Sequence, residues 1–203
     1  MINTIASTVK TKLQELDIFE RFGGITRAYT RKGVTLPISF DVDGEQCWEQ
    51  GTHKDLVPND RFKSVAYLEQ RTPVTEGLSD RGAKRKPSYT VGLRLVCWVN
   101  LRKLGYNTPT VTDRIILTVQ KKLRENSRVH TVTEADFTGA QVEIQAMNVV
   151  NATKEDIFSQ YSHAEFNRHL LFPFAFFAID MTAVLHLSDS CFTEVTAQTP
   201  IEC

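Results

Sequence analysis

The chain has 203 residues, of which 41% are hydrophobic and 24% are charged, and these proportions are ordinary for a globular protein. Its 24 basic and 24 acidic side chains cancel, so no bulk charge points to nucleic acid or an anionic membrane as the partner. The four cysteines are widely scattered without a CxxC pair, which argues against a disulfide scaffold or a structural zinc and favours a reducing, cytosolic compartment.

The first third of the chain is predicted to be one helix followed by strands. Apolar residues at helical spacing predict an amphipathic helix over residues 1–18. From Ile25 to Trp48 the pattern is strand-like, with a break near Gly33 and a hairpin turn at Asp43 and Gly44, a favoured turn dipeptide. Residues 62–68 are predicted to form a further strand.

Residues 69–88 are predicted to be a long, exposed loop between two strands. Two prolines and two glycines interrupt regular structure in this segment. The basic side chains of the segment are Arg71, Arg81, Lys84, Arg85 and Lys86. A solvated connector explains this composition. A contact loop explains it equally well, because basic side chains on a mobile segment suit acidic protein surfaces or phosphates.

The stretch from Tyr89 to Lys122 is predicted to form the centre of the protein, as a long strand, a short turn and an amphipathic helix. Apolar residues at every second position from Tyr89 to Leu101 indicate a half-buried strand, and Val96 and Trp98 indicate that part of its second face is also covered. Thr108 and Pro109 resemble a helix start. The apolar stripe of this helix is Val111, Ile115, Ile116, Val119 and Leu123.

The last third is predicted to contain two strands and a short helix. Residues 126–139 read as a polar linker and 154–161 as the short helix. The strand 141–150 places Val142, Ile144 and Ala146 on one face, and the strand 172–187 closes the fold. These elements predict an α+β domain over residues 1–191, with a mostly antiparallel sheet and two main amphipathic helices packed on it, and a polar tail over 192–203.

No catalytic, cofactor-binding or metal-binding signature is present, so the sequence predicts a protein without catalysis and without a cofactor. The widely spaced cysteines and histidines do not supply the four converging ligands of a structural zinc site. The apolar run from Leu170 to Ile179 is too short to span a bilayer. Residues 1–4 lack the basic and apolar regions of a signal peptide.

One short motif supports an alternative, enzymatic hypothesis. The segment 39–44 resembles the first motif of haloacid-dehalogenase-like phosphatases, an apolar strand ending in DxDG, although Glu45 stands where that family has a threonine. The resemblance implies a Mg²⁺-dependent hydrolase with Asp41 as nucleophile and Asp43 as general acid. A hairpin turn at Asp43 and Gly44 accounts for the same residues without any catalytic role.

The order of elements is similar to that of phage tail-terminator and related neck proteins. An N-terminal amphipathic helix precedes a strand-rich section, a long strand leads directly into a second helix, and a partly alternating strand closes the domain. The chain differs from that family by its long loop from Arg71 to Lys86 and by an added section over residues 126–161. The resemblance therefore does not distinguish a terminator from a tail-completion or head-closure protein.

The resemblance implies a virion structural protein, assembled in the host cytoplasm. Its subunits would form a homo-oligomeric ring, usually of six, that stops tube growth and joins the tail to the head connector. Its partners would be other copies of the chain and other tail and neck proteins. DNA would pass through the ring without sequence-specific contacts, and no membrane would be involved. The contacts are expected from Arg71, Arg81, Lys84, Arg85, Lys86, the Asp43–Gly44 hairpin and the tail from Cys191. A monomeric adaptor that binds an acidic partner through the basic loop is a further alternative.

Overall fold

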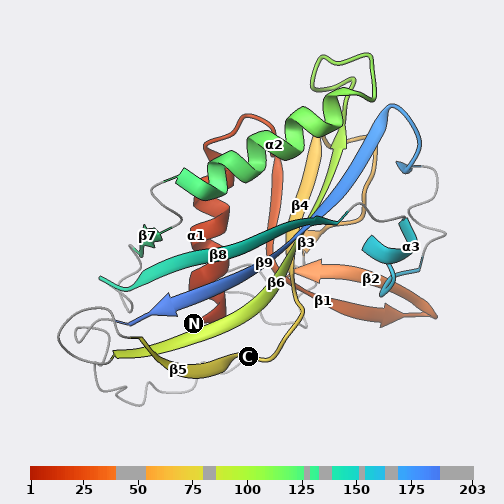
Figure 1. The fold of residues 1–203 in the computed structure, drawn as a ribbon. Coiled ribbons are helices and arrows are strands. Elements are labelled where there is room, and N and C mark those ends of the chain that lie inside the picture. The colour runs from red at the N-terminus through yellow and green to blue at the C-terminus, as the bar shows by residue number, and fades with distance from the viewer. Residues whose placement is uncertain are drawn as a thin grey trace.

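The computed structural model describes residues 1–39, 54–79, 86–125, 129–132, 139–150, 154–162 and 169–187. The elements run in the order α1 (Ile2–Gln14), β1 (Arg21–Arg31), β2 (Val34–Ser39), β3 (Lys54–Asp55), β4 (Ser64–Gln70), β5 (Thr75–Ser79), β6 (Lys86–Asn100), α2 (Val111–Arg124), β7 (Val129–Thr131), β8 (Gln141–Val150), α3 (Lys154–Ile157) and β9 (Phe174–His186). All of these strands belong to one sheet, whose order is β3-β2-β1-β4-β6-β9-β8-β7, with β5 also pairing with β6 (Figure 1).

The sheet is mostly antiparallel, and the predicted α+β class is confirmed. Among the described pairs only β1 and β4 run parallel. The centre is the β6–β9 pair, which stays in register from Ser88 opposite His186 to Asn100 opposite Phe174. Its length explains why both strands have strong patterns in the sequence, since each is buried along most of its course.

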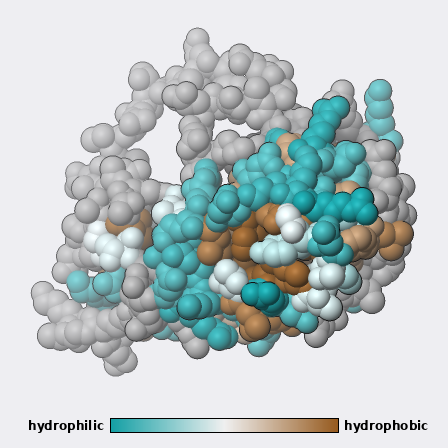
Figure 2. Space-filling view, turned by 90° about the horizontal axis from the view of Figure 1, so that it is seen from above, coloured by the Kyte–Doolittle hydropathy of each residue, from teal (hydrophilic) through white to brown (hydrophobic). Residues whose placement is uncertain are grey.

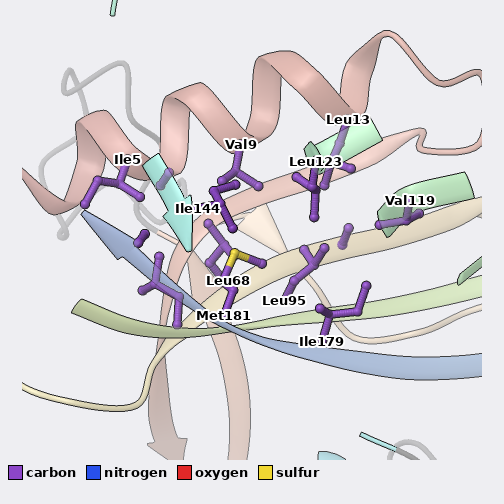
Figure 3. Close-up of a cluster of buried hydrophobic side chains, with 14 of the residues drawn as sticks. Ile5, Val9, Leu13, Leu68, Leu95, Val119, Leu123, Ile144, Ile179 and Met181 are labelled. Atoms are coloured by element: carbon purple, nitrogen blue, oxygen red, sulfur yellow. The ribbon is translucent and has the colours of Figure 1, made fainter. Parts of the chain in front are cut away.

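The two main helices cover one face of this sheet, as the apolar stripes predict. Ile5, Val9 and Leu13 lie one helical turn apart along α1 and point from it toward the sheet (Figure 3). The buried stripe of α2 is Ile115, Ile116, Val119 and Leu123. Both stripes meet the predicted inner face of β6 and β9 in one hydrophobic core.

The second face carries a smaller hydrophobic core, which confirms that Val96 and Trp98 are covered. Trp98 is 1% exposed, and its indole Nε1 donates a hydrogen bond of 2.7 Å to the carbonyl of His169. Its ring stacks on Phe174 with centroids 5.2 Å apart. Phe158, just after α3, and Leu56, just after β3, complete this second core over the β4–β6–β9 part of the sheet.

The predicted loop over residues 69–88 is wrong over much of its length. Residues 75–79 form β5, and β6 already begins at Lys86. β4 and β5 both pair antiparallel with β6, from Ser64 opposite Val99 to Ser79 opposite Lys86, and so form one arm of a long hairpin whose other arm is β6. The prolines and glycines obscured this arm because its strand state comes from pairing with β6 rather than from local propensity.

The alternation predicted for 141–150 fails after Ile144. A β-bulge lies between Ile144 and Ala146, where the register against β9 shifts by one residue. Ala146 is consequently exposed, while Met147 is buried in the main core. One inserted residue moves every later side chain of the strand to the opposite face of the sheet, and the sequence pattern does not mark the insertion.

The boundaries of other elements also differ from the prediction. α1 ends at Gln14, and α2 begins at Val111 with Thr110 as N-cap and without a side-chain cap hydrogen bond, so Thr108 and Pro109 precede the helix. The linker predicted at 126–139 contains β7, and α3 ends at Ile157. The break near Gly33 is confirmed, because Lys32 and Gly33 have positive φ angles of 50° and 77° between β1 and β2.

Candidate functional site

The long hairpin formed by β4, β5 and β6 is the first candidate surface. The bend between β4 and β5 stays attached to β6, because the backbone N–H of Arg71 donates to the Gly92 carbonyl at 2.8 Å and the Gly92 N–H donates to Thr72 Oγ1 at 2.7 Å. A Cβ at Gly92 would lie 3.0 Å from Thr72 Cγ2, so the close contact favours glycine at this position. The hairpin is therefore continuous through its bend.

The β5 arm lies at the surface of the protein. Residues 71–78 are all exposed, and Leu78 leaves 62% of its area uncovered. β5 pairs with β6 and with no other strand of the described part of the chain. In Figure 1 it lies along the first half of β6, on the side opposite β9. An exposed strand with one unpaired edge is a template for pairing with another chain.

The structure separates the two basic residues that it describes in the predicted contact loop. Arg71 lies in the bend opposite Gly92, and its Nη1 is 3.7 Å from Glu69 Oε2. Lys86 is the first residue of β6, six positions before Gly92, which is roughly 20 Å along a strand. Arg81, Lys84, Arg85, Asp43 and Gly44 lie outside the described residues, as do Asp41 and the tail 192–203.

A buried polar cluster on the second face of the sheet is the other candidate, and the sequence analysis missed it. Arg94 on β6 and Asp180 on β9 form a bidentate ion pair, with Nε–Oδ1 and Nη2–Oδ2 distances of 2.7 and 2.9 Å. Arg94 Nη1 also donates to the carbonyl of Asp156 in α3 at 3.1 Å. Both residues lie in strands that the sequence predicts, but only the β6–β9 register shows that they are opposite each other.

Glu69 on β4 lies beside this ion pair and is 3% exposed. Its Oε1 accepts a hydrogen bond of 2.8 Å from the hydroxyl of Tyr161, whereas its Oε2 accepts none from the described residues. Burial raises the pKa of the Glu69 carboxyl above its usual value, an effect that the Tyr161 hydroxyl and the charges of Arg71 and Arg94 only partly offset. Burial likewise raises the pKa of Tyr161.

A cavity of about 410 Å³ lies where β1 diverges from β4. The two strands pair up to Thr26 opposite Glu69, and beyond this point β1 continues against β2. Polar side chains line the cavity, among them Asn3, Arg27, Glu69, Gln70, Gln160 and Tyr161. Glu69 is the one carboxylate in its lining, and it accepts the hydrogen bond of the Tyr161 hydroxyl, which lines the same cavity.

No group of three or more His, Cys, Asp or Glu side chains within the described ranges could hold a metal ion. None of the helices in these ranges is long and apolar enough to cross a membrane. On the side where α2 lies, hydrophobic residues gather in the middle of the described surface, with hydrophilic residues above and beside them (Figure 2). Cys97 is buried, and its burial raises the pKa of the thiol.

Glu69→Gln tests whether the buried carboxyl makes stability depend on pH. Because the pKa of Glu69 is raised in the folded state, the native protein binds the carboxyl proton more tightly than the unfolded chain does. Protonation of Glu69 therefore stabilises the fold fully below the usual pKa of 4.5, and this contribution to the free energy of unfolding is lost as pH rises through the folded-state pKa. We expect the free energy of unfolding of Glu69→Gln to rise relative to wild type across that window, by up to about 1.4 kcal/mol per pH unit.

Urea unfolding at a series of pH values from 4.5 to 8 measures this difference. Glu76→Gln on the exposed strand β5 is the matched control for removing one surface carboxylate. Parallel curves for wild type and Glu69→Gln over the whole series would show that folding leaves the pKa of the Glu69 carboxyl unchanged.

No protein-family model matches the chain, and no curated protein matches it.

Proposed function

We propose that the protein is a structural subunit of a phage virion, of the tail-terminator or neck type, and that it acts as a homo-oligomeric ring joining tail to head connector. The long hairpin with its exposed β5 arm is the observation that carries the proposal. An open strand edge forms backbone hydrogen bonds with a neighbouring chain and does not require a catalytic group. The order of elements is the second support, because helix, strands, central strand, helix and closing strand follow one another as in that family.

The fold favours this role over the phosphatase alternative. Haloacid-dehalogenase-like enzymes are built on a doubly wound parallel sheet, whereas the described sheet contains one parallel pair. A ring subunit also explains the hairpin better than a monomeric adaptor does. The described basic residues of the former loop, Arg71 and Lys86, are far apart along the strands, while the open backbone edge of β5 is continuous.

Shortening the hairpin tests the proposed role. Gly77 lies opposite Ser88, so replacing residues 78–87 by Asn-Gly joins two paired residues through a favoured two-residue turn. We expect the full-length chain to form a discrete ring as its concentration rises and the shortened chain to remain monomeric. The shortened chain should keep its fold, because Leu78, Lys86 and Pro87, among the residues replaced, belong to neither core.

Light scattering after size exclusion, over a concentration series, measures the assembly, and circular dichroism measures the fold. Leu117→Ser, at an exposed position of α2, controls for loss of an exposed apolar side chain. A folded, shortened chain that assembles like the full-length protein would remove the hairpin from the interface. A full-length chain that stays monomeric at every concentration would contradict the ring itself.

A further inference from the structure

One edge of the sheet is protected against pairing with another chain. On β2, Pro37 has no backbone N–H to offer. The N–H of Thr35 donates to Ser162 Oγ, and the Thr35 carbonyl accepts from the Ser162 N–H, both at 2.8 Å. β3 pairs with the remaining Ile38 and Ser39. Thr35, Ile38 and Ser39 are therefore paired within the chain and Pro37 offers no donor, which is how natural sheets avoid adding strands.

Two other edges lack such protection in the described part of the chain. β5 contains no proline and no basic residue, carries Glu76 as its one charge, and is exposed. On the opposite side, β7 covers only the stretch of β8 from Gln141 to Glu143. No strand of the described ranges pairs with the outer side of the stretch from Ala146 to Val150, which contains no charged residue and no proline. Both edges can accept a strand.

The directions of the strands make these two edges complementary. β5, β6, β9 and β8 are successive neighbours, and each runs antiparallel to the next. A second copy that continues the sheet therefore places its β5 antiparallel to the β8 of the first copy. Every pair in the continued sheet then has the same antiparallel geometry.

The stagger between the two edges fits a curved, closing arrangement. Gly77, in the middle of β5, pairs with Ser88 on β6, which in turn pairs with His186 on β9. Asn148, in the middle of the open part of β8, pairs with Asp180 on β9. His186 and Asp180 are six residues apart, so the two edges are offset by about 20 Å along the strands. Going from β5 of one copy across β6, β9 and β8 to β5 of the next copy takes four strand spacings, or about 19 Å across the sheet. The resulting slope is about 45°, at the upper end of the tilt that closed sheets require.

We infer that the ring is held together by edge pairing between copies, in which β5 of one subunit adds to the open half of β8 of the next. The inference rests on the proposed ring and specifies its interface. It pairs two different edges, so every subunit uses both and the chain of contacts closes only when the ring is complete. Centred pairing places Gly77 opposite Asn148.

Mixed cysteine cross-linking tests this interface. In a background where Cys47, Cys191 and Cys203 are serine, one protein carries Gly77→Cys and another Asn148→Cys. Both positions are exposed, and a Cβ at Gly77 meets only Ser88 Oγ, at 3.5 Å. After mixing and mild oxidation, we expect a covalent dimer in the mixture at about tenfold the amount in either protein alone, because assembly raises the local thiol concentration. Leu117→Cys replaces Asn148→Cys in the control mixture.

Each result identifies a different failure. As much covalent dimer in Gly77→Cys alone as in the mixture would show two-fold pairing of β5 with β5 and overturn the inference. Light scattering of the same samples separates the remaining cases. A ring without a cross-link in the mixture would overturn the β5–β8 interface while leaving the ring in place, and monomers throughout would contradict the ring and, with it, the inference.

Discussion

Trp98→Ala should destabilise the fold by about 3–5 kcal/mol, the usual cost of removing a large aromatic side chain from a core. The indole is 1% exposed, stacks on Phe174 and packs among the residues of the second core. The substitution leaves a cavity between the sheet and the segment that contains α3. It also removes the hydrogen bond to the His169 carbonyl. This loss is a large fraction of the stability of an ordinary domain.

Urea unfolding followed by far-ultraviolet circular dichroism measures the loss, since the indole cannot serve as the reporter. Trp98→Phe separates the two contributions, because it keeps an aromatic ring in the core and loses the N–H donor. We expect Trp98→Phe to cost less than Trp98→Ala. Leu117→Ala, at a position that is 63% exposed, should change the free energy of unfolding by no more than about 0.5 kcal/mol. Equal losses at Trp98 and Leu117 would contradict the second core.

Arg94→Met should destabilise the protein by about 2–3 kcal/mol, because the substitution keeps an aliphatic chain and removes the guanidinium group that joins three elements. Asp180 loses its bidentate partner on β9, and the Asp156 carbonyl in α3 loses its donor. The expected loss is smaller than for a fully buried pair, since the Asp180 side chain is 38% exposed and regains water. The Arg94 charge also lowers the pKa of Glu69, so the variant should hold the Glu69 proton to higher pH.

A double-mutant cycle with Asp180→Ala measures the coupling between the two side chains. We expect the double variant to be less destabilised than the sum of the single variants. Lys63→Met is the matched control, because Lys63 pairs with the fully exposed Asp17 across 2.9 Å and such surface pairs contribute little. Additive losses at Arg94 and Asp180 would show that the ion pair contributes nothing beyond its separate side chains.

The same cluster connects stability to the proposed interface. Arg94 and Asp180 lie on the face of β6 and β9 that continues toward the open half of β8, and Asn148 is level with Asp180. A cavity of about 230 Å³ between Arg71, Arg94, Asn148 and Asp180 marks this uncovered stretch of the sheet. The ion pair thus lies beside the edge that we infer receives β5.

The amino-acid sequence by itself determined the elements whose burial repeats at a regular interval. The apolar stripes of α1 and α2 and the alternation along β6 and β9 fix which side chains face the main core, because period determines facing along a helix or a strand. These features were sufficient to predict an α+β protein with two helices on a mostly antiparallel sheet. The turn at Lys32 and Gly33 was equally readable, since it depends on local backbone conformation.

Only the tertiary structure decided the features that depend on a distant partner. β5 is a strand because β6 extends beyond β4 and pairs with it, although the prolines and glycines of the segment 69–88 favour a loop. The bulge after Ile144 is fixed by the register of β8 on β9. Glu69, Arg94, Asp180 and Tyr161 come from four separate segments, so their cluster exists only after the strands have paired. Strand pairing and register are long-range contacts, and a one-residue shift in either redirects side chains without changing the local pattern.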